Sequence, residues 1–125
     1  MNKKTGNMKS RIAIGTIIFF LGCVSLTNAQ SNQYEIKKAV KNAVEKAKEI
    51  GMLTRIDTQN KSFYIKRVYW FAFNSKQKEN TVRAFARYFG YFIYDMDSAV
   101  GIYVKDNQSG KTLATYGVWE GVVIK

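Results

Sequence analysis

Residues 74–116 read NSKQKENTVRAFARYFGYFIYDMDSAVGIYVKDNQSGKTLATY, and this stretch decides the fold because its pattern changes from helical to extended at Gly90. Before Gly90, apolar residues recur at intervals of three and four, which predicts an amphipathic helix over residues 76–89. Asn74 or Ser75 offers an N-cap for this helix, and Gly90 ends it. Its apolar face consists of Val82, Phe85, Ala86 and Phe89.

After Gly90 the sequence predicts β-structure separated by polar turns. The segment Asp106-Asn107-Gln108-Ser109-Gly110 is rich in turn-forming residues, and Gly110 can adopt a positive φ, so a hairpin is expected around it. The expected strands are residues 91–94, 100–105, 112–116 and, interrupted at Gly121, 118–124.

The chain before residue 74 predicts another helix and further strands. Residues 34–50 form an amphipathic helix, and Gly51 follows where a left-handed C-terminal cap is expected. Residues 53–57 predict a short strand, and the β-branched and aromatic run over residues 62–73 predicts a long one. The apolar face of the helix consists of Ile36, Val40, Ala43, Val44, Ala47 and Ile50.

In chain order the elements are a helix, one or more strands, a second helix and a β-meander. This order predicts an α+β domain in which two helices pack on one face of a mainly antiparallel sheet of about four strands. Residues 30–125 contain no internal repeat, low-complexity tract or proline. A segment of this length buries enough surface for one core, so we expect a single small domain.

The first 29 residues have the three parts of a secretory signal peptide. Four basic residues precede or adjoin an apolar run over residues 12–26, which is shorter than the ~20 residues of a membrane-spanning helix. Cleavage after Ala29 would leave a periplasmic or extracellular domain over residues 30–125. The alternative is lipid attachment at Cys23, which follows a glycine, and this would leave the protein lipid-anchored.

The residue types exclude most catalytic and metal chemistry. The chain has no histidine, and its only cysteine lies in the signal segment. The domain therefore lacks the usual general base at neutral pH, the Cys and Ser-His nucleophile arrangements, and the ordinary zinc and copper ligands. We expect a non-enzymatic protein without a cofactor.

The chain is strongly basic, with a formal net charge of +11. Removal of residues 1–29, which hold four basic residues and no acid, lowers this charge to +7. In a cytosolic protein such an excess would suggest nucleic acid, which is not expected for an exported domain. An acidic protein or glycan is the expected partner, and an anionic membrane surface is the alternative.

Each predicted helix carries a stripe of basic side chains beside its apolar face. If the helices pack side by side, the stripes merge into one surface that would attract an anionic partner. The alternative is that the stems of these side chains cover the edge of the apolar face while their charges stay in water. The candidates are Lys37, Lys41 and Lys48 on the first helix and Lys76, Arg83 and Arg87 on the second.

Aromatic residues of the predicted strands are further candidates. Alternate residues of a strand point to opposite faces, so some aromatic rings leave the core unless both faces are covered. An exposed row would suit sugar stacking or a protein interface, with Trp70 and Trp119 as candidate contacts, and burial in the core is the alternative.

Residues 78–116 look like part of small exported bacterial domains of unknown function. The hairpin around residues 106–110 also resembles the strand-turn-strand end of PepSY-type envelope domains, although the second helix interrupts their helix-then-sheet order. The resemblance carries over no function, ligand or site residue. It rests on Arg83, Ala86, Tyr88 and Gly90, on residues 101–104 and on residues 106–114.

These patterns predict an exported, non-enzymatic binding domain of the bacterial envelope that engages an acidic partner through basic helix faces and sheet aromatics. One alternative is a peripheral or lipid-anchored envelope protein that binds anionic lipid. Another is a hydrolase that uses Asp95, Asp97 or Glu120 as a carboxylate pair, although the two aspartates are also typical turn formers.

Overall fold

The computed structural model of the chain describes residues 33–125. Its helices are α2 (Gln33–Glu49), α3 (Arg67–Ala72), α4 (Ser75–Tyr88) and the π-helix η1 (Phe89–Ile93). Its strands are β1 (Leu53–Asp57), β2 (Ser62–Ile65), β3 (Ile102–Asp106), β4 (Thr112–Gly117) and β5 (Gly121–Ile124). The predicted signal segment, with Cys23 and the cleavage site after Ala29, lies outside the described residues.

The strands form one five-stranded sheet in the order β1-β2-β3-β4-β5. Three of the four pairs are antiparallel, and β2 and β3 are parallel. The parallel pair arises because the chain leaves β2 through α3, α4 and η1 before it returns in β3, which is the crossover that parallel strands require. This confirms the α+β class, with five strands rather than the expected four.

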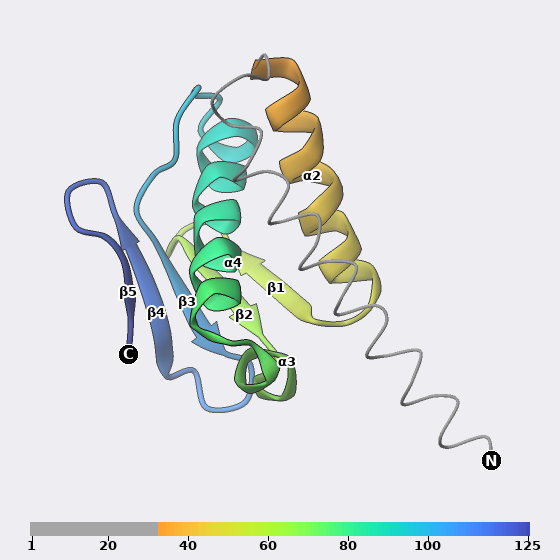
Figure 1. Ribbon diagram of the computed structural model, residues 1–125, viewed down its shortest axis with the longest axis vertical. Helices are drawn as coiled ribbons and strands as arrows, with labels where there is room; N and C mark the ends of the chain where they lie inside the picture. The colour runs from red at the N-terminus through yellow and green to blue at the C-terminus, as the bar shows by residue number, and fades with distance from the viewer. Residues whose placement is uncertain (1–32) are drawn as a thin grey trace.

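Both long helices lie on one face of the sheet (Figure 1), as the sequence predicts. α2 packs against β1 and against α4, while α4 covers β3, β4 and β5. In each helix the buried residues recur at intervals of three and four, so the apolar stripes face the sheet and the neighbouring helix. The helical layer therefore presents only its outer face to a partner.

An aromatic cluster joins the helical layer to the sheet. Phe63 of β2 is fully buried and stacks on Phe85 of α4, with ring centres 4.5 Å apart and planes 3° apart. The ring of Phe89 meets the ring of Phe63 edge to face, with ring centres 6.0 Å apart. These contacts bring β2 and α4 together at the centre of the core.

The opposite face of the sheet carries a cross-strand row of polar and aromatic residues. Arg55, Tyr64 and Lys105 occupy paired positions on β1, β2 and β3. The guanidinium of Arg55 lies 4.1 Å from the centre of the Tyr64 ring. Tyr103, two positions before Lys105, is 46% exposed on this face.

The predicted strand over residues 62–73 is wrong in its second half, because β2 has only four residues and α3 follows it. Trp70 and Phe73 are buried, whereas Val68 and Phe71 are 70% and 64% exposed. A spacing of three between buried residues is helical, and it lets this segment cover the end of the core. The β-branched and aromatic residues of α3 are typical of strands, so the sequence did not predict this helix.

The predicted strand over residues 91–94 is also wrong, because η1 continues α4 as a π-helix. Gly90 lies so close to the following loop that a Cβ atom there would be 1.8 Å from the carbonyl oxygen of Ser98. Tyr91 on η1 is buried against α2. These aromatic residues therefore serve the helical layer rather than the sheet.

The two C-terminal hairpins agree with the sequence more closely. Gly110 has a φ of +74° in the β3–β4 turn, and its N–H donates to the carbonyl oxygen of Asp106 at 2.9 Å. The last strand begins at Gly121, with a φ of +73°, rather than at residue 118. Residues 118–120 form the turn between β4 and β5.

Candidate anionic-partner binding surface

The basic stripe of α2 lies beside α4 and η1. The ammonium group of Lys37 is 5.5 Å from the centre of the Tyr91 ring, and that of Lys48 is 5.7 Å from the centre of the Tyr88 ring. Cation–π contacts of this kind hold the stripe along the junction of the helices. Lys41, between the two in sequence, is exposed.

Lys37 also fastens α2 to the loop after η1. Its Nζ lies 2.7 Å from Oδ1 of Asp97, and Nε2 of Gln33 donates to the carbonyl oxygen of Asp97 at 3.2 Å. The hydrogen bond with Asp97 raises the pKa of Lys37. The ammonium group of Lys37 is therefore paired with the Asp97 carboxylate. This ion pair orients the N-terminal half of α2.

A hollow of 440 Å³ opens on the outer side of α2 next to η1. Tyr34 and Phe92 place aromatic rings there that are 72% and 40% exposed. Neither Lys38 nor Lys41 forms an ion pair with any residue that the structure describes. We call this the α2–η1 surface, and it consists of Tyr34, Lys37, Lys38, Lys41, Asn42, Glu45 and Phe92.

The basic stripe of α4 belongs to the same helical layer. Nη2 of Arg83 lies 3.2 Å from Oε1 of Glu79, the pair that their spacing of four predicts. Lys76 is exposed, and Arg87 is partly buried. α2 and α4 pack side by side, and the merging of their two stripes into one surface stays a prediction.

The two tryptophan candidates have opposite environments. Trp70 is 2% exposed and packs edge to face with Phe73, with ring centres 6.4 Å apart. Trp119 is 97% exposed in the β4–β5 turn, beside the exposed Val118. Trp70 is thus a core residue, whereas the ring of Trp119 is accessible to a partner.

The acidic residues considered for catalysis lie in turns and loops. Asp97 is paired with Lys37, and Asp95 has a φ of +55° in the same loop. Glu120 lies in the β4–β5 turn, where its side chain covers Gly117. Within residues 33–125, no three His, Cys, Asp or Glu side chains are placed to hold a metal ion.

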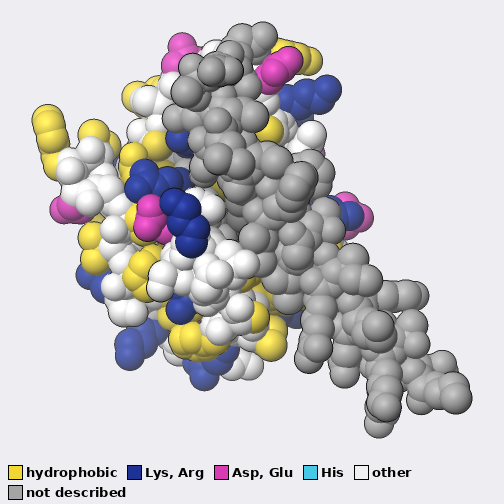
Figure 2. All heavy atoms as spheres, in the orientation of Figure 1, with side chains coloured by type: hydrophobic (Ala, Val, Ile, Leu, Met, Phe, Trp, Pro, Cys, Tyr) yellow, Lys and Arg dark blue, Asp and Glu magenta, His cyan; other side chains and the backbone are white. Residues whose placement is uncertain are grey.

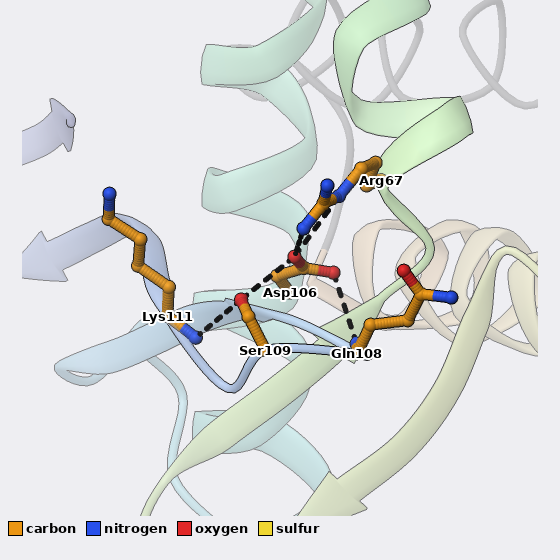
Figure 3. A network of polar contacts seen from close by, with 5 residues as sticks. All are labelled: Arg67, Asp106, Gln108, Ser109 and Lys111. Carbon is orange, nitrogen blue, oxygen red and sulfur yellow. Dashed lines mark hydrogen bonds and ion pairs between the residues drawn. The ribbon is translucent and has the colours of Figure 1, made fainter.

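Sequence reasoning missed a polar network at the end of β3 (Figure 3). Oδ2 of Asp106 accepts hydrogen bonds from Nε of Arg67 at 3.2 Å, from its Nη2, and from Oγ of Ser109 at 2.9 Å. Oδ1 accepts from the backbone N–H of Gln108 at 3.1 Å. The N–H of Lys111 donates to Oγ of Ser109 at 3.2 Å. The network ties α3 to the β3–β4 turn.

Asp106 is a buried but fully paired carboxylate, with its side chain 4% exposed. The hydrogen bond from Arg67, followed by that from the N–H of Gln108, lowers the pKa of Asp106 to about 2. The hydrogen bonds of Asp106 with Gln108 and Ser109 are predictable, because an aspartate at the start of a turn commonly bonds to the residues that follow it. The partnership with Arg67 was not predictable, because Arg67 fell within an expected strand.

No protein-family model matches the chain, and neither a curated protein nor a solved structure matches it. The resemblance to small exported domains and to PepSY-type domains therefore stays a prediction. Among residues 33–125, no helix is both long and apolar enough to cross a membrane.

Proposed function

We propose that this chain is an exported, non-enzymatic binding domain whose α2–η1 surface engages an acidic partner, either a protein face or a glycan. One observation supports this most: Lys38 and Lys41, without an ion-pair partner among residues 33–125, lie beside the exposed rings of Tyr34 and Phe92. The signal-like pattern of residues 1–29 supports export.

Lysines and aromatic rings contribute differently to such a surface. Unpaired lysines on a basic domain attract acidic partners over long range and speed association. Tyr34 and Phe92 offer apolar area that packs against a bound side chain or stacks on a sugar ring. The ion pair of Lys37 with Asp97 keeps the N-terminal half of α2 in position relative to η1.

Charge reversal tests this proposal. The purified chain is titrated with a glutamate-rich peptide and with a polyuronate oligosaccharide, and a neutral peptide and a neutral oligosaccharide serve as references. Lys38→Glu combined with Lys41→Glu should weaken binding of the preferred acidic probe at least about tenfold, because two attractive charges become repulsive. The stronger of the two acidic probes identifies the class of partner.

A matched control separates site binding from general attraction. Arg55→Glu combined with Lys105→Glu changes the net charge by the same amount on the opposite face of the sheet. It should leave most of the affinity intact. Equal losses in both double variants, or no binding of either acidic probe, would refute the proposal.

A further variant, Arg87→Glu, measures the contribution of α4. If the two helical stripes act as one surface, this change should weaken binding of the acidic probe as much as Lys41→Glu does. Wild-type affinity in Arg87→Glu, with reduced affinity in Lys41→Glu, would restrict the site to α2 and η1.

A further inference from the structure

A second basic hollow, of 320 Å³, lies at the end of the molecule formed by α3, the β3–β4 turn and the last residue of the chain. Figure 2 shows Lys and Arg side chains beside hydrophobic ones at this lower end, where Figure 1 places α3. Four cationic residues from separate parts of the chain line it: Arg67, Lys78, Lys111 and Lys125.

Negative charge among the residues that line the hollow is confined to the Asp106 side chain and the α-carboxylate of Lys125. Asp106 is the only acidic side chain in the lining, and it is already bonded to Arg67, Ser109 and the N–H of Gln108. The three lysines form no ion pair within residues 33–125. Nη1 of Arg67 also finds no acceptor among those residues. The hollow thus holds several unused cationic donors.

The wall of the hollow is apolar and partly aromatic. Phe71 is 64% exposed, and the half-buried Leu113 also lines the hollow. The ammonium of Lys78 lies 5.5 Å from the centre of the Trp70 ring and 5.6 Å from that of Phe71. These cation–π contacts hold the Lys78 ammonium against the aromatic part of the lining.

From this arrangement we infer that the hollow binds the phosphate group of a small organic phosphate whose apolar part packs on Phe71 and Leu113. Four cationic side chains from separate segments suit a phosphate group, whose oxygens accept charge-assisted hydrogen bonds from both arginine and lysine. The volume is near the lower limit of ligand pockets, which suits a small ligand. A free phosphate monoester and the headgroup of an anionic phospholipid both carry this chemistry.

This inference goes beyond the proposed function, because it concerns a different ligand and different residues. Titration of the ¹⁵N-labelled chain with phenyl phosphate, followed by NMR, should give saturable shifts at the amides of Lys78, Lys111 and Thr112. Inorganic phosphate should bind about tenfold more weakly, since it cannot use Phe71. Phenylacetate binding as tightly as phenyl phosphate would overturn the preference for phosphate.

Two variants divide the site into its charged and apolar parts. Lys78→Gln combined with Lys111→Gln should weaken phenyl phosphate at least about tenfold, because two charge-assisted contacts are lost. Phe71→Ser should weaken phenyl phosphate but leave inorganic phosphate unchanged. Phe71 and Lys111 are exposed whereas Lys78 is partly buried, so circular dichroism verifies that each variant keeps the fold.

The matched control is Lys38→Gln combined with Lys41→Gln, which removes the same charge from the α2–η1 surface. It should leave phenyl phosphate binding unchanged, and an equal loss there would mean general electrostatic attraction and overturn the inference. These probes differ from the acidic peptide and glycan that test the proposed function. The α2–η1 surface can therefore fail its test while the phosphate site passes, and the phosphate site can fail while the α2–η1 surface passes.

Short-chain lipids distinguish the two sources of phosphate. Monomeric dihexanoylphosphatidylglycerol is compared with the zwitterionic dihexanoylphosphatidylcholine in the same titration. Binding of phosphatidylglycerol but not of phenyl phosphate assigns a lipid headgroup, and the opposite result assigns a free monoester. If neither ligand shifts the amides around Lys78 and Lys111, the inference is wrong.

Discussion

Asp106 holds α3 against the β3–β4 turn through its bonds with Arg67 and Ser109. Its pKa is about 2 in the folded protein, below the ordinary value of 3.8. A carboxyl whose pKa is depressed by folding stabilises the protein above its ordinary pKa. This contribution is lost as the pH falls from about 4 to about 2.

Arg67→Gln should shift this acid sensitivity upward. Without the guanidinium the pKa of Asp106 rises toward 3.8, so its contribution is lost at a higher pH and is smaller at neutral pH. Urea unfolding over the acidic range, with the Asp106 carboxyl titrated by ¹³C NMR, measures both effects. Lys66→Gln is the control, and an unchanged acid profile in Arg67→Gln would contradict the assigned role.

Gly90 allows the backbone of the helical layer to lie close to the loop at Ser98. Gly90→Ala would place its Cβ 1.8 Å from the carbonyl oxygen of Ser98, so the loop must move. We expect a loss of about 1–3 kcal/mol in the free energy of unfolding, measured with denaturant. Gly117→Ala, whose Cβ would lie nearest to the flexible side chain of Glu120, should cost less. Equal costs would contradict this explanation.

At the scale of elements, the start of α4 depends on a reciprocal cap. Oδ1 of Asn74 accepts from the N–H of Gln77 at 2.9 Å, and Oε1 of Gln77 accepts from the N–H of Asn74 at 2.8 Å. Asn74→Ala should lower the free energy of unfolding by about 1 kcal/mol, whereas Asn74→Asp keeps the acceptor and should cost little. Thermal unfolding compares them, and a harmless Asn74→Ala would refute the role of the cap.

The elements that sequence predicts well are those whose local pattern and tertiary burial agree. The helices around Val40 and Val82 and the turn at Gly110 are of this kind, because periodicity and turn chemistry alone identify them. α3 and η1 are different. Their aromatic residues have strand-like composition, and only contact with α2 and the end of the core makes them helical.

The candidate sites also differ in how far a local sequence pattern predicts them. Lys37 and Lys41 were predictable from helical spacing, and their helix places them on one surface with Phe92. The hollow beside Arg67 was not predictable, because its residues come from α3, α4, a turn and the chain end. They meet only through the β2–β3 crossover and the pairing of β5, which no local pattern encodes.

At the scale of the whole molecule, one aromatic residue, Phe63 of β2, links the sheet to the helical layer. Phe63 is fully buried among Phe85, Phe89 and Tyr88. Phe63→Ala should cost about 3–5 kcal/mol, a large part of the roughly 5–15 kcal/mol that stabilises a small domain. Chemical denaturation measures the loss, with Tyr64→Ala on the opposite face as the milder control. Similar costs would contradict a single core centred on Phe63.

The two basic hollows lie toward opposite ends of the helical layer, with η1 at the upper end and α3 at the lower end of Figure 1. α4 runs between these ends and has 14 residues. At 1.5 Å per residue it is about 21 Å long, which exceeds the screening length of about 8 Å at physiological salt. Ligands at the two ends should therefore influence each other little.

We expect saturating phenyl phosphate to change the affinity for the glutamate-rich peptide by less than about twofold at physiological salt, since separated sites contribute additively. At low salt the screening length grows, so the first anion should weaken binding of the second. Peptide titrations with and without phenyl phosphate, at both salt concentrations, measure this coupling. Full displacement at physiological salt would mean that both anions use one surface, and that the positive charge of this domain serves a single site.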